Sequence, residues 1–98
     1  MLIDVLQEDR RVIVLLCLAE AGGRLNEAVV RKALVAVGHQ VDATDVRAVL
    51  QFLRDAALVR IETLPMPSGE VWVAHLLDAG AAVARGKPHP GVAPPPLR

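Results

Sequence analysis

Hydrophobic residues recur at helical spacing in two segments, one on each side of Gly38. In the first segment, residues 27–37, Asn26 is suited to cap the start of a helix and Gly38 to end it. Leu25 before the cap and Val30 inside the helix are spaced as a hydrophobic staple. The apolar stripe of this helix leaves its polar residues toward solvent: Glu27, Arg31 and Lys32.

The second segment begins after Asp42, with Thr44 as an alternative cap and Val41 and Val46 as the staple pair. Asp45 lies in the first turn, where the positive end of a helix favours a carboxylate. The apolar residues follow three- and four-residue intervals: Val46, Val49, Leu50, Leu53 and Ala57. This helix therefore directs a polar face outward, made of Thr44, Arg47, Ala48, Gln51, Arg54 and Asp55.

An earlier helix is predicted over residues 9–21, either alone or after a short helical turn at residues 4–7, and two glycines end it. Its middle, "VIVLLCLA" (residues 12–19), is apolar on all sides. A surface helix needs only one apolar stripe. This helix is therefore central in the fold, covered by several elements, or partly covered by a second subunit.

After residue 57, "LVRIET" and "EVWVAHL" alternate apolar and polar residues around the loop "LPMPSG", which predicts an antiparallel hairpin. Trp72 and Ala74 share one face of the second strand, and we expect Trp72 to pack inward against the helices. A last short helix is predicted from residue 77 or 78 to Arg85, where Gly86 ends it.

These elements predict one domain over residues 1–86 and a tail over residues 87–98. The tail, "KPHPGVAPPPLR", holds five of the seven prolines and almost nothing to bury, so we expect it to be extended and mobile. The predicted fold class is mainly α with a small antiparallel β-hairpin.

Three helices, a hairpin and a closing helix, in this order, resemble the winged helix-turn-helix, with a three-helix core, a two-stranded wing and a C-terminal helix. The stretch "GEVWVAHLLDAGAAVARG" is similar to the ending of many winged-helix regulators of the ArsR and MarR type. His75 and Asp78 stand where threonines are usual there.

The opening "MLIDVLQEDRRVIVLLCLAEAGGRLNEAVVRKALVAVGHQV" resembles more closely the short ArsR-like winged-helix proteins of Mu-like phages and prophages. That resemblance implies a DNA-binding protein associated with phage genes for head assembly and packaging.

Composition changes this picture in two respects. The chain has eleven basic and eleven acidic residues, so no overall positive charge draws it to nucleic acid. The lone Cys17 lies in the apolar run, which is typical of a small buried hydrophobe in a reducing compartment. That run is shorter than the roughly 20 residues a membrane span needs, and acidic residues before it argue against a signal peptide. We expect a cytoplasmic protein with no membrane partner.

The candidate chemistry is recognition of double-stranded DNA. In a DNA-reading winged helix the third helix enters the major groove, so Arg47 and Gln51 would read bases, Arg onto guanine and Gln onto adenine. The remaining candidates are Thr44, which could reach a phosphate or a base, and three phosphate-binding residues: Arg31, Lys32 and Arg54. Acidic residues share these surfaces, and residues 24–60 hold six basic and four acidic side chains, a net of +2. The same face could therefore be an ordinary solvated surface of mixed charge.

The same pattern bears on two other classes of function, favouring one and arguing against the other. The hairpin tip has no basic residue and carries Met66 between two prolines, which suits a protein-interaction or phage-assembly module. An enzyme is not indicated, because no nucleophile–base pair, carboxylate pair or phosphate loop has a recognisable spacing. We expect no cofactor and no metal, since a metal sensor of the ArsR kind needs closely spaced thiolates and the chain has one cysteine.

Self-association is also expected. The all-round apolar segment 12–19 and the Ala-rich "DAGAAVA" (residues 78–84) predict a homodimer built from the first and last helices. Other phage proteins are the alternative partners.

Overall fold

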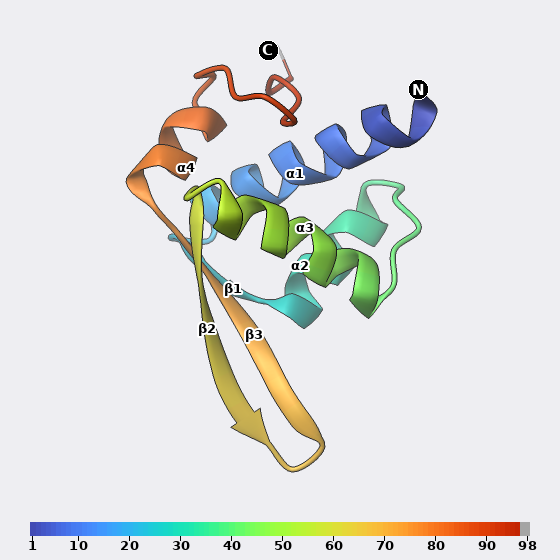
Figure 1. Cartoon of the computed structure of the whole chain (residues 1–98), viewed down its shortest axis with the longest axis vertical. Helices are drawn as coiled ribbons and strands as arrows, with labels where there is room; N and C mark the ends of the chain where they lie inside the picture. The colour runs from blue at the N-terminus through green and yellow to red at the C-terminus, as the bar shows by residue number, and fades with distance from the viewer. Residues whose placement is uncertain (97–98) are drawn as a thin grey trace.

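The computed structural model describes residues 1–96 and has four helices and a three-stranded antiparallel sheet in that range (Figure 1). The helices bury their apolar faces against one another and against one side of the sheet, and the hairpin projects away from them (Figure 1). This is the arrangement of a small winged-helix domain, so the predicted fold class is confirmed.

Helix α1 (Leu2–Glu20) is longer than the sequence pattern predicted, since it is continuous from residue 2 and absorbs the expected separate turn. Residues 2–20 contain no glycine or proline, and Asp4 lies favourably in the first turn. Its buried side chains are Val12, Val14, Leu15 and Leu18. The other three helices and strand β3 all pack against α1, so its apolar middle is covered within one chain.

Helices α2 (Glu27–Ala36) and α3 (Ala43–Asp55) begin where the caps predicted. Asn26 Oδ1 accepts a hydrogen bond from Val29 N at 3.0 Å. Asp42 and Asp45 form a reciprocal capping box, each carboxylate accepting from the other's backbone N–H, at 2.8 and 3.0 Å. The backbone N–H of Asp45 lowers the pKa of Asp42. Asp42 is thus the cap, and the alternative, Thr44, lies inside the helix.

Strands β2 (Val59–Met66) and β3 (Gly69–Leu76) form the predicted hairpin, with Thr63 opposite Trp72. The expectation of only two strands is wrong, because β1 (Arg24–Asn26) pairs with the other edge of β3. Three residues are too few to show an alternating pattern, and the pairing depends on a strand about fifty residues away. Trp72 packs against the core from the inner face of the sheet, as predicted.

Helix α4 (Asp78–Ala84) follows β3 directly and packs on α1. Residues 87–96, which we call the C-terminal strap, then fold back over α1 (Figure 1). Arg11 Nη1 donates to Gly91 O at 2.8 Å, Ala93 N donates to Glu8 O at 3.1 Å, and Val92 is buried. The prediction that this segment has almost nothing to bury is therefore wrong, and residues 97–98 lie outside the described part of the chain.

Candidate nucleic-acid interface

The outer face of α3 exposes three of the residues predicted to contact DNA, namely Thr44, Gln51 and Arg54. Lys32 is exposed on α2. Arg54 Nε lies 3.5 Å from the carboxylate of its neighbour Asp55, and the Arg54 side chain is 45% exposed. A long charged side chain in such a weak surface pair can leave it for a phosphate at little cost.

Arg31 makes one hydrogen bond within the fold. Its Nε donates to Val41 O at 3.2 Å, which links α2 to the segment before α3. The residue as a whole remains exposed. Arg31 therefore combines a structural hydrogen bond with an accessible positive charge.

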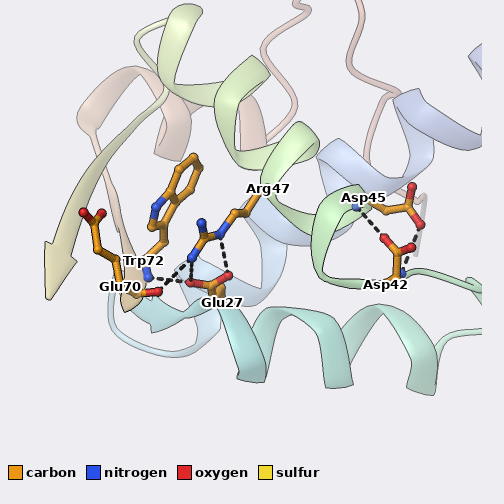
Figure 2. Close-up of polar contacts among 6 residues, drawn as sticks. All are labelled: Glu27, Asp42, Asp45, Arg47, Glu70 and Trp72. Carbon is orange, nitrogen blue, oxygen red and sulfur yellow. Dashed lines mark hydrogen bonds and ion pairs between the residues drawn. The ribbon is translucent and has the colours of Figure 1, made fainter. Parts of the chain in front are cut away.

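Arg47, predicted to be an exposed base reader, is instead held by the protein (Figure 2). Its Nε and Nη2 donate to the two carboxylate oxygens of Glu27 at 2.8 and 2.9 Å, and Nη2 also donates to Glu70 O at 2.8 Å. A bidentate guanidinium–carboxylate pair is among the strongest polar contacts in proteins. The expectation of a freely exposed Arg47 is wrong, because its side chain points toward β3.

Glu27 is the centre of this arrangement, although the sequence pattern placed it in solvent. Its side chain is only 15% exposed, and its carboxylate also accepts from Trp72 N at 2.6 Å. The hydrogen bonds from Arg47 lower the pKa of Glu27, and the Trp72 N–H adds to this, while burial acts in the opposite direction. Glu27 is thus stabilised as a carboxylate.

The two side chains continue the edge pairing of β3 beyond the end of β1. Leu76 N donates to Gly23 O at 2.7 Å, and the pairing with β1 ends at Asn26. Past that point Glu27 accepts from Trp72 N and Arg47 donates to Glu70 O. Polar groups of a strand edge need partners, and here side chains supply them. We call Glu27, Arg47 and the bonded backbone of residues 70 and 72 the wing brace.

The wing brace joins three elements, because Glu27 begins α2, Arg47 lies in the middle of α3, and residues 70–72 belong to the hairpin (Figure 2). The Trp72 ring adds a further contact, with the guanidinium carbon of Arg47 4.6 Å and that of Arg54 5.9 Å from its centroid. The wing brace therefore links the hairpin to α2 and α3.

A carboxylate partly offsets the positive charges at the base of the hairpin. Arg24, His75 and Arg60 lie opposite one another on the three strands. His75 Nε2 lies 2.9 Å from Glu62 Oε1, and this hydrogen bond lowers the pKa of Glu62. Arg24 Nη2 lies 3.9 Å from the same oxygen. The acidic residue thus offsets much of the positive charge of this row.

The described residues, 1–96, contain no group of three or more side chains that could hold a metal ion. Burial raises the pKa of Cys17, which favours the neutral thiol over the metal-binding thiolate.

His39 is buried and links α1 to the turn between α2 and α3. Its Nε2 lies 2.8 Å from Asp9 Oδ2, and its Nδ1 accepts from Arg10 Nε at 3.3 Å. Across residues 1–96, no helix has the length and apolar character of a membrane span.

Comparison with known proteins decides the family. The uncharacterized protein gp26 of Escherichia phage Mu is 33% identical over 87 residues, which cover 89% of this chain and 86% of the relative. The chain belongs to the gp26 family. An uncharacterized protein of Haemophilus influenzae is 34% identical over 61 residues, 62% of this chain and 60% of that protein. No family model matches the chain, and no solved structure matches it.

Membership of the gp26 family supports a phage origin, as the opening residues indicated.

The positions of Glu27 and Arg47 explain why the sequence pattern did not predict the wing brace. Glu27 and Arg47 are twenty positions apart on different helices, and each occupies a position that helical periodicity assigns to solvent. The exposed residues of α3 were found because their orientation depends on local periodicity alone.

Proposed function

We propose that this gp26-family protein is a non-enzymatic DNA-binding protein of a phage or prophage, which places α3 in the major groove of duplex DNA. The observation that supports it is the polar outer face of α3 beside a hairpin that the wing brace holds at a fixed angle. This pairing of a helix and a wing is the geometry with which winged helices span a groove and its flanking backbone.

In this proposal Gln51 is the principal base reader, because its exposed amide can bond bidentately to adenine and Arg47 is engaged elsewhere. Arg54, Lys32 and Arg31 contact phosphates, and Thr44 contacts a phosphate or a base. Arg47 positions the wing instead of reading a base. A role as a transcriptional regulator of the ArsR or MarR type is the form of this function that the sequence resemblance suggests.

Fluorescence anisotropy with random and phage-derived duplexes, over a series of salt concentrations, tests this proposal. Affinity should fall steeply with salt, since each phosphate contact releases counterions. Arg54→Ala should weaken binding to every sequence and reduce the salt slope by about one, whereas Gln51→Ala should cost about 1–3 kcal/mol only at a preferred site.

Arg85→Ala is the matched control, because it removes an exposed arginine at the end of α4. It should leave DNA affinity unchanged. Equal losses for Arg54→Ala and Arg85→Ala would show non-specific attraction, and absence of binding at low salt by a folded protein would refute the DNA proposal.

A second candidate is a protein-interaction module of phage head assembly or DNA packaging. The hairpin tip favours it, because Met66 is 52% exposed and the tip residues 63–70 contain no basic side chain that could hold phosphate. Met66→Glu should then abolish recovery of a phage protein in a pull-down while leaving any DNA binding unchanged. The reverse result would favour the DNA-binding proposal.

A further inference from the structure

The first turns of α1 carry an exposed apolar surface. Leu2, Ile3 and Val5 are 73%, 56% and 60% exposed, and this end of the helix extends past α2 and α3 (Figure 1). Asp4 lies among them with its side chain 65% exposed. We call residues 2–5 the helix tip. Several large apolar side chains exposed together, in contrast to single ones, mark an interaction surface.

A groove that could receive the helix tip of another copy lies near the other end of α1, between β1, the start of α2 and the hairpin. Its cavity measures about 500 Å³, and its lining residues are Ala21, Arg24, Leu25, Asn26, Val29, Leu64 and Val73. Five of these seven residues are apolar, and Val29 among them is 41% exposed. We call it the sheet groove.

The helix tip and the sheet groove each expose one charged side chain, and the two charges are opposite. The tip presents the carboxylate of Asp4, which lies 3.9 Å from the N-terminal ammonium, and the groove presents the guanidinium of Arg24 beside mostly apolar residues. Arg24 is 62% exposed, and its ion pair with Glu62 is long, at 3.9 Å. It is therefore available to a carboxylate from another molecule.

The two surfaces cannot meet within one chain. Helix α1 has 19 residues and is about 28 Å long at 1.5 Å per residue, and Ala21 in the groove wall follows its far end. We propose that copies of this chain associate head to tail, with the helix tip of one copy seated in the sheet groove of the next. Such a contact joins two different surfaces, so it is heterologous and can continue into a ring or a filament.

This contact differs from a dimer through the first and last helices. The middle of α1 is covered by α4, by the other helices and by the C-terminal strap, and the buried side of α4 packs on α1 of its own chain. The apolar residues that motivated that dimer thus have partners within one molecule. The proposed association does not depend on DNA binding.

Sedimentation velocity over a range of protein concentrations, with two variants studied alone and mixed, tests the proposal. Ile3→Glu places a charge on the helix tip, and Val29→Glu places one in the sheet groove. The native chain should form species larger than its 10.5 kDa monomer. Each variant alone should stay monomeric, whereas an equimolar mixture should form dimers, because each variant retains the surface that the other has lost.

Val35→Glu is the matched control, because it places a charge at an exposed apolar residue of α2 outside both surfaces, and it should associate like the native chain. A charge swap provides a second measurement: Asp4→Arg and Arg24→Asp should each weaken association, and the double variant should restore it. Circular dichroism checks that each variant is folded. A native chain that stays monomeric, or a mixture that fails to associate, would overturn the proposal, and the latter result would indicate a contact between like surfaces.

Discussion

At the residue scale, the Glu27 carboxylate receives three hydrogen bonds, from Arg47 Nε, Arg47 Nη2 and Trp72 N. Each side chain would leave donors or acceptors without partners if the other were removed. Removing one partner of such a pair destabilises the protein more than its share of the pair, because the other polar group is left without a hydrogen bond; removing both avoids this. Glu27 and Arg47 should therefore behave as one energetic unit.

Glu27→Ala should lower the free energy of unfolding by about 1–3 kcal/mol, because the Trp72 N–H and the guanidinium both lose an acceptor. The Glu27→Ala, Arg47→Ala double variant should lose less than the sum of the two single variants. Urea denaturation followed by the fluorescence of Trp72, the single tryptophan, measures both effects. Glu20→Ala, at an exposed site on α1, is the control, and additive losses would contradict the coupling.

The same carboxylate makes stability depend on pH. The pKa of Glu27 is lowered in the folded chain, whereas in the unfolded chain it is about 4.3. The unfolded chain therefore binds the proton more readily, and the stabilisation present above about pH 4.3 is lost as the pH falls toward the lowered pKa. The stability difference between the native chain and Glu27→Gln should narrow when urea denaturation is repeated from about pH 6 down to about pH 3. A constant difference would show that Glu27 is not ionised in the folded state in the way its contacts indicate.

At the element scale, the features that the sequence predicted are those with local causes. The caps at Asn26 and Asp42 depend on residues three positions away, and the periodicity of α3 depends on residues within two turns. Strand β1 has only three residues and depends on β3, and the direction of the Arg47 side chain depends on Glu27. The pairing of β1 and the direction of Arg47 depend on residues far away in the sequence, so no local pattern predicts them.

Helix α4 offers a test in which two effects on stability have opposite signs. Alanine is favoured over glycine inside a helix by about 1 kcal/mol, so propensity alone predicts that Gly80→Ala stabilises the protein. A Cβ at this position, however, would overlap the backbone oxygen of Leu58 and lie 2.8 Å from Leu76 Cδ1. Overpacking typically costs about 1–3 kcal/mol, so we expect a net loss.

Thermal unfolding followed by circular dichroism measures this loss. Ala79→Ser, at an exposed position of the same helix, is the control and should change stability little. A more stable Gly80→Ala variant would show that α4 does not pack against Leu58 as closely as described.

At the scale of the whole molecule, the C-terminal strap changes what the composition suggested. Its prolines remain largely exposed, but residues 91–93 meet a surface formed by α1 and α3. Arg11 stacks on the Phe52 ring, 3.6 Å from its centroid, and its Nη1 holds Gly91 O. Gly91 has a φ of 79°, and a Cβ there would lie 2.7 Å from Phe52 Cζ, so the residue must be glycine. Composition predicted a free tail because these contacts join residues about eighty positions apart.

Removal of residues 87–98 should therefore destabilise the protein. Burial of a valine side chain such as Val92 contributes about 1.5–3 kcal/mol, and the truncation also removes the acceptor of Arg11 and uncovers Phe52. Urea denaturation followed by Trp72 fluorescence should show a lower midpoint, and Val92→Ser in the full chain should reproduce much of the loss. A shorter truncation after residue 94 keeps the contacts of Gly91, Val92 and Ala93 and should cost much less. If removal of all twelve residues left the midpoint unchanged, the strap would contribute nothing to the fold and the expectation of a free tail would stand.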